Sequence, residues 1–280
     1  MKYLIFGANG MAGHMTALYL KEQGHTVVGY AKTACTVCES IIGDALDRDN
    51  VKKALASDDF DVVVNCIGIL NKAVDMDMST GIYLNSVFPH LLADSLKNTT
   101  VKVIHISSDC VFIGDKGEYK ENSVKDAESF YGKTKALGEI IDDKNLTIRT
   151  SIVGPELKED GVGLFHWFMS QTGFVNGFSE VIWTGVTTLQ LAKAIEAASI
   201  QNITGLFQLV NNTTVNKYEL LCLFNKYCKN NKTVIHENGS FSSDKSLINT
   251  RTDFDFKVPS YKQMIIDMSG WIKAHNDLYS

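Results

Sequence analysis

The stretch FYGKTKALGE (130–139) places Tyr131 four residues before Lys135. On a helix this spacing is about one turn, so the phenol and the ammonium lie on one face and can meet. The pair is either an idle surface contact or a phenol whose acidity an ammonium tunes. A tuned phenol can pass a proton to a reacting oxygen, provided that the fold brings other polar groups beside it.

A second polar cluster lies in ISSDCVF (106–112), where an apolar run ends. Ser107, Ser108 and Asp109 stand at the carboxyl end of a predicted strand, and ligands of open α/β sheets bind beyond the carboxyl ends of strands. Serine and aspartate are also common in turns, so this pattern is weak by itself. Together with Tyr131 and Lys135, this cluster predicts three polar features near one crevice: the Ser/Asp cluster, the phenol and the ammonium.

The stretch GANGMAG (7–13) carries Gly7, Gly10 and Gly13 at three-residue intervals between a predicted strand and a predicted helix. Glycines there permit a tight turn and the close approach of a phosphate, which the helix N-terminus can bind through its free N–H groups. A plain strand–helix turn is the alternative. The position at the first strand of a βαβ pattern favours a dinucleotide site.

Two residues bear on the kind of dinucleotide. The second strand ends GYAKT (29–33) without the acid expected for NAD, and Lys32 stands there instead. A cation suits the 2′-phosphate of NADP, while a solvated loop lysine is an equally weighted alternative. Asp44, at the end of the third strand, either accepts from the adenine amino group or caps the following helix. We therefore expect NADPH, with NADH as the alternative.

These residues must be positioned by a regular alternation of apolar strands and helices, which predicts a parallel sheet covered on both faces. Right-handed crossovers then give an α/β, doubly wound (Rossmann) fold. We expect strands at 2–6, 26–30, 40–44, 61–68, 101–108 and 146–154, and helices at 11–24, 47–57 and 83–97.

After Pro155 the pattern changes to an aromatic stretch and amphipathic helices. We expect helices at 187–199, 216–229 and 261–275, with a strand at 205–210. The chain is thus divided into a dinucleotide-binding domain (1–155) and a smaller substrate-binding lobe (156–280) that is partly interleaved with it.

Composition excludes several classes of function. The 280 residues carry a net charge of −5 and no long basic run, which argues against nucleic-acid binding. No apolar stretch is long enough for a membrane span, and MKYLIF is too short for a signal region. Six scattered cysteines fit the reducing cytoplasm. Cys35 and Cys38 form C-x-x-C without a second pair, so we expect no metal.

Taken together, the three glycines, SSD (107–109) and YGKTK (131–135) resemble the extended short-chain dehydrogenase/reductases, whose motifs are G-x-x-G-x-x-G and Y-x-x-x-K. More narrowly, the chain is similar to the dTDP-4-dehydrorhamnose reductase family. That family's S-T-D-Y-V-F, Y-G-x-(S/T)-K-x-x-G-E and R-T-S-W correspond to SSDCVF, YGKTKALGE and RTSI here. FGANGMAG and GDALD also agree in order. The motifs cover the first 155 residues, and the remainder matches only in general layout.

The resemblance implies roles for individual residues. Ser108 would bond the C4 oxygen of the substrate, Tyr131 would deliver the proton, and Lys135 would lower the pKa of the phenol and hold the nicotinamide ribose. Asp109 would contact the substrate or orient its loop. Further cofactor contacts are expected at Gly10, Met11, Ala12, Asp44, Ala45, Cys66, Ile67 and Gly68.

Two departures from the family pattern fall where the sugar would lie. Cys110 replaces the family's tyrosine and Ile152 its tryptophan, so a differently substituted sugar, such as an N-acetylated one on UDP, could use the altered space in place of the rhamnose-type hexose. Arg251, in NTRTDF, is our candidate for the substrate diphosphate because a guanidinium binds phosphate in a bidentate fashion.

The expected activity is the NADPH-dependent reduction of the C4 ketone of a nucleotide-linked 4-keto-6-deoxy sugar, in the synthesis of deoxysugar or polysaccharide precursors. The alternatives are a reductase of a UDP-linked N-acetylated 4-keto sugar, and a nucleotide-sugar epimerase or dehydratase of the same fold. A different class is a non-catalytic NADP-binding subunit, as in the regulatory partner of methionine adenosyltransferase. Because some members of the resembling family form dimers, a homodimer is a possible state of this protein.

Overall fold

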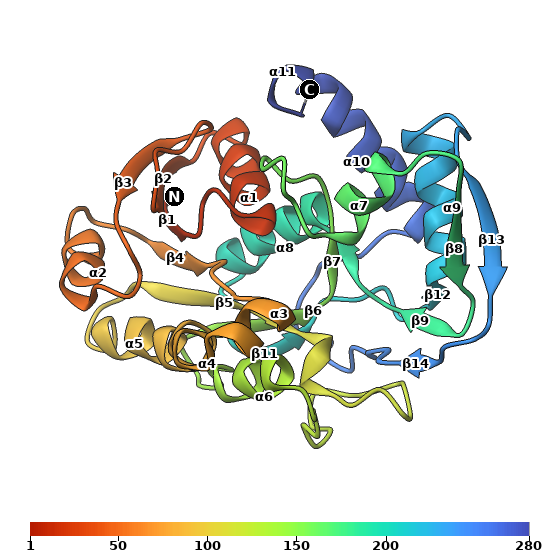
Figure 1. The fold of residues 1–280 in the computed structure, drawn as a ribbon. Helices are drawn as coiled ribbons and strands as arrows, with labels where there is room; N and C mark the ends of the chain where they lie inside the picture. Colours follow the sequence, from red (N-terminus) through yellow and green to blue (C-terminus); the bar gives the residue numbers. More distant parts are fainter. Residues whose placement is uncertain (280) are drawn as a thin grey trace.

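The computed structural model describes residues 1–279, and a sheet of seven parallel strands forms its centre (Figure 1). The strand order is β11-β6-β5-β4-β1-β2-β3. This order confirms the predicted doubly wound α/β fold. Its strands are β1 (Lys2–Phe6), β2 (Thr26–Ala31), β3 (Glu39–Ile42), β4 (Val62–Asn65), β5 (Lys102–Ser108), β6 (Leu146–Thr150) and β11 (Gly205–Gln208).

Helices cover both faces of this sheet, which is why the central strands β4, β5 and β6 are buried along their whole length. One face carries α1 (Met11–Glu22) and α8 (Thr188–Ile200). The other carries α2 (Arg48–Leu55), α5 (Phe88–Ser95) and α6 (Phe130–Leu137) (Figure 1).

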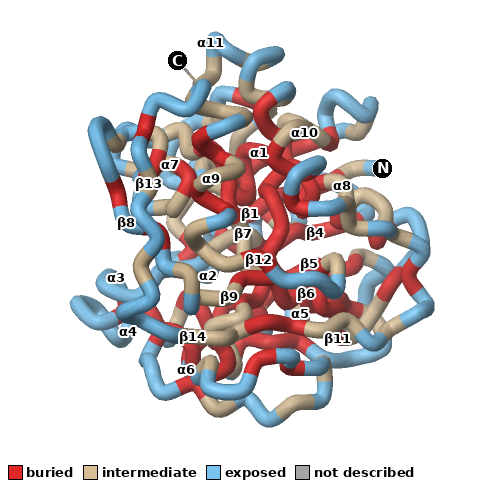
Figure 2. Tube along the Cα trace, turned by 90° about the vertical axis from the view of Figure 1, so that its right-hand side faces the viewer, coloured by how far each residue is buried: buried red, intermediate tan, exposed pale blue. Residues whose placement is uncertain are grey.

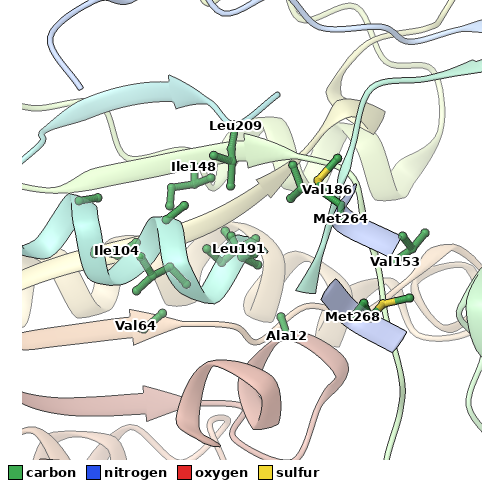
Figure 3. Close-up of a cluster of buried hydrophobic side chains, with 14 of the residues drawn as sticks. Ala12, Val64, Ile104, Ile148, Val153, Val186, Leu191, Leu209, Met264 and Met268 are labelled. Atoms are coloured by element: carbon green, nitrogen blue, oxygen red, sulfur yellow. The ribbon is translucent and has the colours of Figure 1, made fainter. Parts of the chain in front are cut away.

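Each face of the sheet has its own hydrophobic core. Under α8, Leu191 packs with Ile104 and Ile148 of the sheet (Figure 3). On the opposite face, Phe88 and Leu92 of α5 form a second cluster. Figure 2 shows that the buried residues concentrate along the sheet and the helices beside it. This double burial makes the sheet a rigid base for the loops at its carboxyl edge.

The crossover between β4 and β5 differs from the single helix predicted at 83–97. The chain forms α3 (Asn71–Met76), α4 (Met78–Ile82) and a π-helical turn η1 (Tyr83–Val87) before α5. Pro89 lies in the first turn of α5 and has no N–H to donate to the preceding turn. A π-turn next to a proline is therefore consistent with this local gap in the bonding pattern.

The strand predicted at 146–154 is interrupted at Ser151. The chain leaves the main sheet after β6, and β7 (Ile152–Val153) pairs instead with β10 (Val186–Thr187). The strand predicted at 205–210 is β11, which pairs with β6 and so completes the main sheet. Residues from both sides of the expected boundary at 155 thus share one sheet, and the division into two domains stays a prediction.

The remaining elements form a lobe beside the carboxyl edge of the sheet (Figure 1). Its three-stranded sheet has the order β12-β9-β14 and its two-stranded sheet pairs β13 with β8. None of the described helices is both long and apolar enough to cross a membrane. The elements are α7 (Leu164–Ser170), β8 (Phe174–Phe178), β9 (Val181–Trp183), β12 (Val215–Asn216), α9 (Lys217–Cys228), β13 (Val234–Asn238), β14 (Ser243–Asp244), α10 (Tyr261–Ala274) and α11 (Asn276–Tyr279).

Candidate active site

A cleft of about 410 Å³ opens beyond the carboxyl ends of the central strands. Parallel strands end on one edge of a sheet, so residues far apart in the sequence meet there. Most of the residues predicted from the sequence line this cleft: Gly10, Met11, Ala12, Cys66, Ile67, Gly68, Ser107, Ser108, Asp109, Cys110, Tyr131, Lys135 and Ile152. Thr150, Ser151, Glu156 and Gly163 also line it and were not predicted.

The glycine-rich turn forms the floor of one end of the cleft. Gly7 has a φ of +81°, and a Cβ there would lie 3.1 Å from the backbone nitrogen of Ile67. The first turn of α1 has no side-chain cap at Gly10 and no acidic residue. Its N–H groups are therefore suited to an anion, and the turn fits the pyrophosphate of a dinucleotide.

Lys32 and Asp44 come together at the adenosine end predicted for this site. Lys32 Nζ lies 3.0 Å from Asp44 Oδ2. The Leu46 N–H and this ammonium lower the pKa of Asp44. Asp44 does not cap the next helix, because the carboxylate of Asp47 accepts the N–H groups there. Ala45 is buried in the core, which leaves only its backbone for the predicted cofactor contact.

Ser108 and Tyr131 approach each other because α6 packs closely on the turn that follows β5. This turn is the 3-10 helix η2 (Asp109–Val111). A Cβ at Gly132 would lie 2.1 Å from the carbonyl oxygen of Cys110, so only glycine permits this packing. Ser129 caps α6 by accepting the N–H of Gly132. The phenol and the serine hydroxyl consequently face the same part of the cleft.

The phenol of Tyr131 is held in its protonated form. Burial raises its pKa, the nearby Cys110 adds to this, and a hydrogen bond with Ser108 acts in the opposite direction. The predicted lowering of this pKa by Lys135 is wrong, because burial dominates and Lys135 is not among the groups that act on the phenol. A protonated phenol is the form that donates a proton.

Lys135 points below the cleft floor toward β5. Its Nζ donates to the carbonyl oxygen of Ile106 at 2.6 Å and lies 3.5 Å from His105 Nε2. Burial lowers the pKa of Lys135 to about 8, although Glu139 and Cys66 act in the opposite direction. The ammonium is thus positioned by the strand that carries Ser108.

His105 connects Lys135 to β4. The Ile67 N–H donates to Asn65 Oδ1 at 3.1 Å, which turns the Asn65 amide nitrogen toward His105 Nδ1, also at 3.1 Å. His105 Nδ1 therefore accepts, which places the ring proton on Nε2, so the 3.5 Å approach of Lys135 Nζ to Nε2 is a contact between two donors and not a hydrogen bond. Burial and the Lys135 charge hold the pKa of His105 well below its usual range. The contact between His105 and Lys135 was not predicted from the sequence.

A buried ion pair braces the elements that carry the candidate residues. Arg149 of β6 donates through Nε and Nη2 to Glu139 at 2.8 and 2.7 Å. Ser107 donates to the same carboxylate at 2.8 Å. Although burial raises the pKa of Glu139, the bonds from Arg149 hold it below its ordinary value. The sequence analysis missed this pair, although a lone arginine inside an apolar strand was a usable signal.

Arg251 is not brought to the cleft, which corrects its prediction as the diphosphate partner. Its Nη1 donates to the carbonyl oxygens of Thr204 and Leu206 at 2.6 and 3.0 Å. Its Nε donates to Asp253 at 2.9 Å. These partners lie at the amino end of β11, whereas the cleft opens at the carboxyl ends of the strands. The guanidinium is occupied in joining two backbone segments.

No group of three or more His, Cys, Asp or Glu side chains within residues 1–279 is arranged to hold a metal ion. Cys35 and Cys38 are both free thiols. The cleft itself combines a glycine turn, a serine, and a Tyr-x-x-x-Lys helix on a doubly wound sheet. This combination defines an extended short-chain dehydrogenase/reductase.

The chain belongs to the family described as RmlD substrate binding domain, whose model matches residues 1–243. Among its relatives, the dTDP-4-dehydrorhamnose reductase of Mycolicibacterium smegmatis is 31% identical over 142 residues, which is 49% of this chain and 40% of that protein. The probable low-salt glycan biosynthesis reductase Agl14 of Haloferax volcanii is 30% identical over 143 residues, 50% of this chain and 48% of that one. These matches span about half, or less, of the relatives' length.

The fold as a whole is similar to that of a solved dTDP-4-dehydrorhamnose reductase from Bacillus anthracis, determined in complex with NADP. The TM-score is 0.82 at 16% identity, and the alignment covers 97% of this chain and 99% of the other. The likeness at this identity concerns the fold, and it extends through the lobe in which the sequence motifs were weak.

Proposed function

We propose that the protein is an NADPH-dependent reductase of the C4 ketone of a nucleotide-linked 4-keto-6-deoxy sugar. The observation that carries this proposal is the convergence of Ser108 and Tyr131 on one cleft, with Lys135 beneath them and a glycine turn beside them. The names of the relatives, two of which are sugar or glycan reductases, support the same class of reaction.

Reduction of a ketone requires a hydride on carbon and a proton on oxygen, and the bound nicotinamide cofactor supplies the hydride. As the hydride arrives, negative charge grows on the carbonyl oxygen. The Ser108 hydroxyl, which donates to Asp109 Oδ1 at 3.1 Å in this structure, and the Tyr131 phenol are the two groups that would donate to that charge, and Tyr131 gives up its proton. General acid catalysis of this kind contributes about 10²- to 10⁴-fold to the rate.

Lys135 has a separate task in this mechanism. Its ammonium, anchored on the Ile106 carbonyl at 2.6 Å, would hold the nicotinamide ribose, as the resemblance implies. Loss of this ammonium would therefore weaken the binding of the cofactor.

The sugar would lie against Cys110 and Ile152, which are smaller than the tyrosine and tryptophan of the resembling family. Both residues line the cleft. The space that they leave suits a bulkier substituent, so a UDP-linked N-acetylated 4-keto sugar is the alternative substrate. An epimerase or a dehydratase would return its cofactor unchanged, and a regulatory subunit would bind NADPH without turnover.

The test is the stoichiometric oxidation of NADPH with dTDP- and UDP-linked 4-keto sugars, followed at 340 nm with product identification. We expect Tyr131→Phe to keep its NADPH affinity and lose at least about 10²-fold in kcat, because only the proton donor is removed. Tyr227→Phe, in α9 and outside the cleft, is the matched control and should retain full turnover.

Two results would count against the proposal. Full turnover by Tyr131→Phe would remove the phenol from the role of proton donor. Turnover of a nucleotide sugar without net oxidation of NADPH would identify an epimerase or a dehydratase, and the absence of turnover with every 4-keto sugar would favour the regulatory class.

A further inference from the structure

Lys217, the first residue of α9, is a cation beside the cleft that neither the motifs nor the proposed mechanism uses. Its Nζ lies 5.0 Å from the centre of the Trp183 ring. Within residues 1–279 it makes no ion pair or hydrogen bond, and the only charged or ionisable groups that act on it are Asp109 and Cys110. Burial lowers its pKa to about 8, with Asp109 and then Cys110 opposing.

Lys217 does not itself line the cleft, but groups around this ammonium connect it to the cleft wall. Asp109 and Cys110, whose charges reach it, line the cleft next to Ser108. The indole N–H of Trp183, the ring over which it lies, donates to Ser151 Oγ at 2.9 Å. Ser151 lines the cleft as well. Lys217 therefore lies next to residues that form this wall of the cleft.

A half-buried ammonium without a bonded partner is unfavourable, because burial disfavours the charged form unless a counter-charge compensates it. The face of Trp183 compensates part of this cost. Groups with a perturbed pKa cluster at ligand sites. An anionic ligand would add to the compensation that Asp109 gives. The N-terminal N–H groups of α9 are a poorer anion site, since Asn216 and Glu219 form a capping box there.

We propose that Lys217 binds the diphosphate of the nucleotide sugar and so positions its ketone over Ser108 and Tyr131. The inference rests on the proposed function. The diphosphate is the anionic part that every substrate of this class shares, and a cation beside Asp109 offsets the repulsion between that carboxylate and an anion in the same cleft. Arg251, the cation expected from the sequence, is held at the opposite edge of the sheet.

The first test compares three variants for the binding of dTDP and UDP and of the matching nucleosides, by calorimetry. Lys217→Met should lower the affinity for the diphosphates by about 10- to 100-fold, because a charge-assisted bond is lost, and should leave the affinities for the nucleosides and NADPH unchanged. The affinity of Lys217→Arg for the diphosphates should stay within about threefold of the wild-type affinity, because the positive charge is kept. Lys226→Met is the matched control, since this lysine stacks on Tyr227 on the same helix, outside the cleft.

A second readout uses pH. The protonated lysine binds the diphosphate, so wild-type affinity should fall as pH rises through about 8, the pKa of Lys217. The Lys217→Arg protein should show no such fall up to a pH of about 9.5, because a guanidinium stays charged. Two ionisable groups face Lys217, the carboxyl group of Asp109 and the thiol of Cys110, and burial holds the pKa of that thiol at about 12. Lys245, the other cation near Cys110, is common to both proteins.

Several outcomes separate this inference from the proposed function. If wild type binds the diphosphates and Lys217→Met binds them equally well, the inference is overturned even where NADPH oxidation proceeds. A lower melting temperature of Lys217→Met without weaker diphosphate binding would assign the lysine to holding the Asp109 turn, and would also overturn it. If the expected differences appear but no 4-keto sugar is reduced, the inference stands and the proposed reaction fails.

Discussion

Single side chains in this cleft are tuned by burial before any ligand arrives. Burial raises the pKa of the Tyr131 phenol, and it lowers the pKa of Lys135 to about 8. Both shifts have one physical cause, since removal from water disfavours whichever form is charged. A phenol that stays protonated is prepared for proton donation, and a lysine near its titration point responds strongly to a neighbouring charge.

The Lys32–Asp44 pair leads us to a prediction about the preference for NADPH over NADH. Lys32→Ala should lower the affinity for NADPH by about 10-fold, because the partner of the 2′-phosphate is lost while Asp44 remains as a repelling charge. The affinity for NADH, which lacks that phosphate, should be unchanged or higher. Fluorescence titration of both cofactors measures the ratio.

Lys53→Ala, on the exposed side of α2, is the control for a general loss of positive charge. Equal losses of NADPH and NADH affinity in Lys32→Ala would contradict the assignment of this lysine to the phosphate. The side chain of Lys32 is 71% exposed, so the ion pair itself contributes little to stability and the variant should fold normally.

At the scale of elements, the position of Tyr131 depends on how closely α6 packs against η2. Gly132→Ala should move α6, because its new Cβ would lie 2.1 Å from the backbone oxygen of Cys110. We expect a loss of about 1–3 kcal/mol in the free energy of unfolding, as for other overpacked sites, and a fall in kcat through the displaced phenol. Urea unfolding and steady-state kinetics measure the two effects.

Gly270→Ala provides a matched control for the same substitution. Gly270 lies in α10, where an added Cβ meets nothing within 4 Å. Alanine there should stabilise the protein by about 0.5–1 kcal/mol, because glycine is a poor helix former. If both alanine variants behaved alike, the close packing of α6 on η2 would not be the reason for Gly132.

On the scale of the whole molecule, the Glu139–Arg149 pair links β5 and β6 to the segment that follows α6 in the interior. Glu139→Gln should destabilise the fold by about 3–5 kcal/mol, because Arg149 would keep a buried charge without its counter-charge. The linked pH effect has a definite sign. The pKa of Glu139 is lowered on folding. The carboxylate therefore makes its full contribution to the free energy of unfolding above the ordinary carboxyl pKa, and this contribution is lost as pH falls through the lower pKa of the folded state.

Chemical denaturation at pH 7 and near pH 4 checks this prediction, since the difference between wild type and Glu139→Gln should shrink in acid. Asp44→Asn, which breaks the exposed pair with Lys32, is the control and should change stability by less than about 1 kcal/mol. A difference that did not depend on pH would show that the carboxylate charge is not what stabilises the interior.

Local patterns were sufficient for most of the first half of the molecule. The apolar runs in the first sheet strands, the glycine turn at 7–13 and the Tyr131–Lys135 spacing each depend on residues close together in the chain. Strand alternation fixes which edge of a parallel sheet the loops share, so Ser108 was expected near Tyr131 without coordinates. The end of β6 at Ser151 and the π-turn before Pro89 were not visible in this way.

What remained depended on contacts between distant segments, which no local pattern encodes. Arg251 has the right chemistry for a phosphate, yet the fold places it against Thr204 and Leu206. Lys217 carries no motif, yet the pairing of β12 with β9 sets it over Trp183 beside the cleft. Residue types and spacing determine which chemistry a side chain can perform. The long-range packing of a single chain decides which of those side chains share a site, because burial and neighbouring charges exist only after the segments meet.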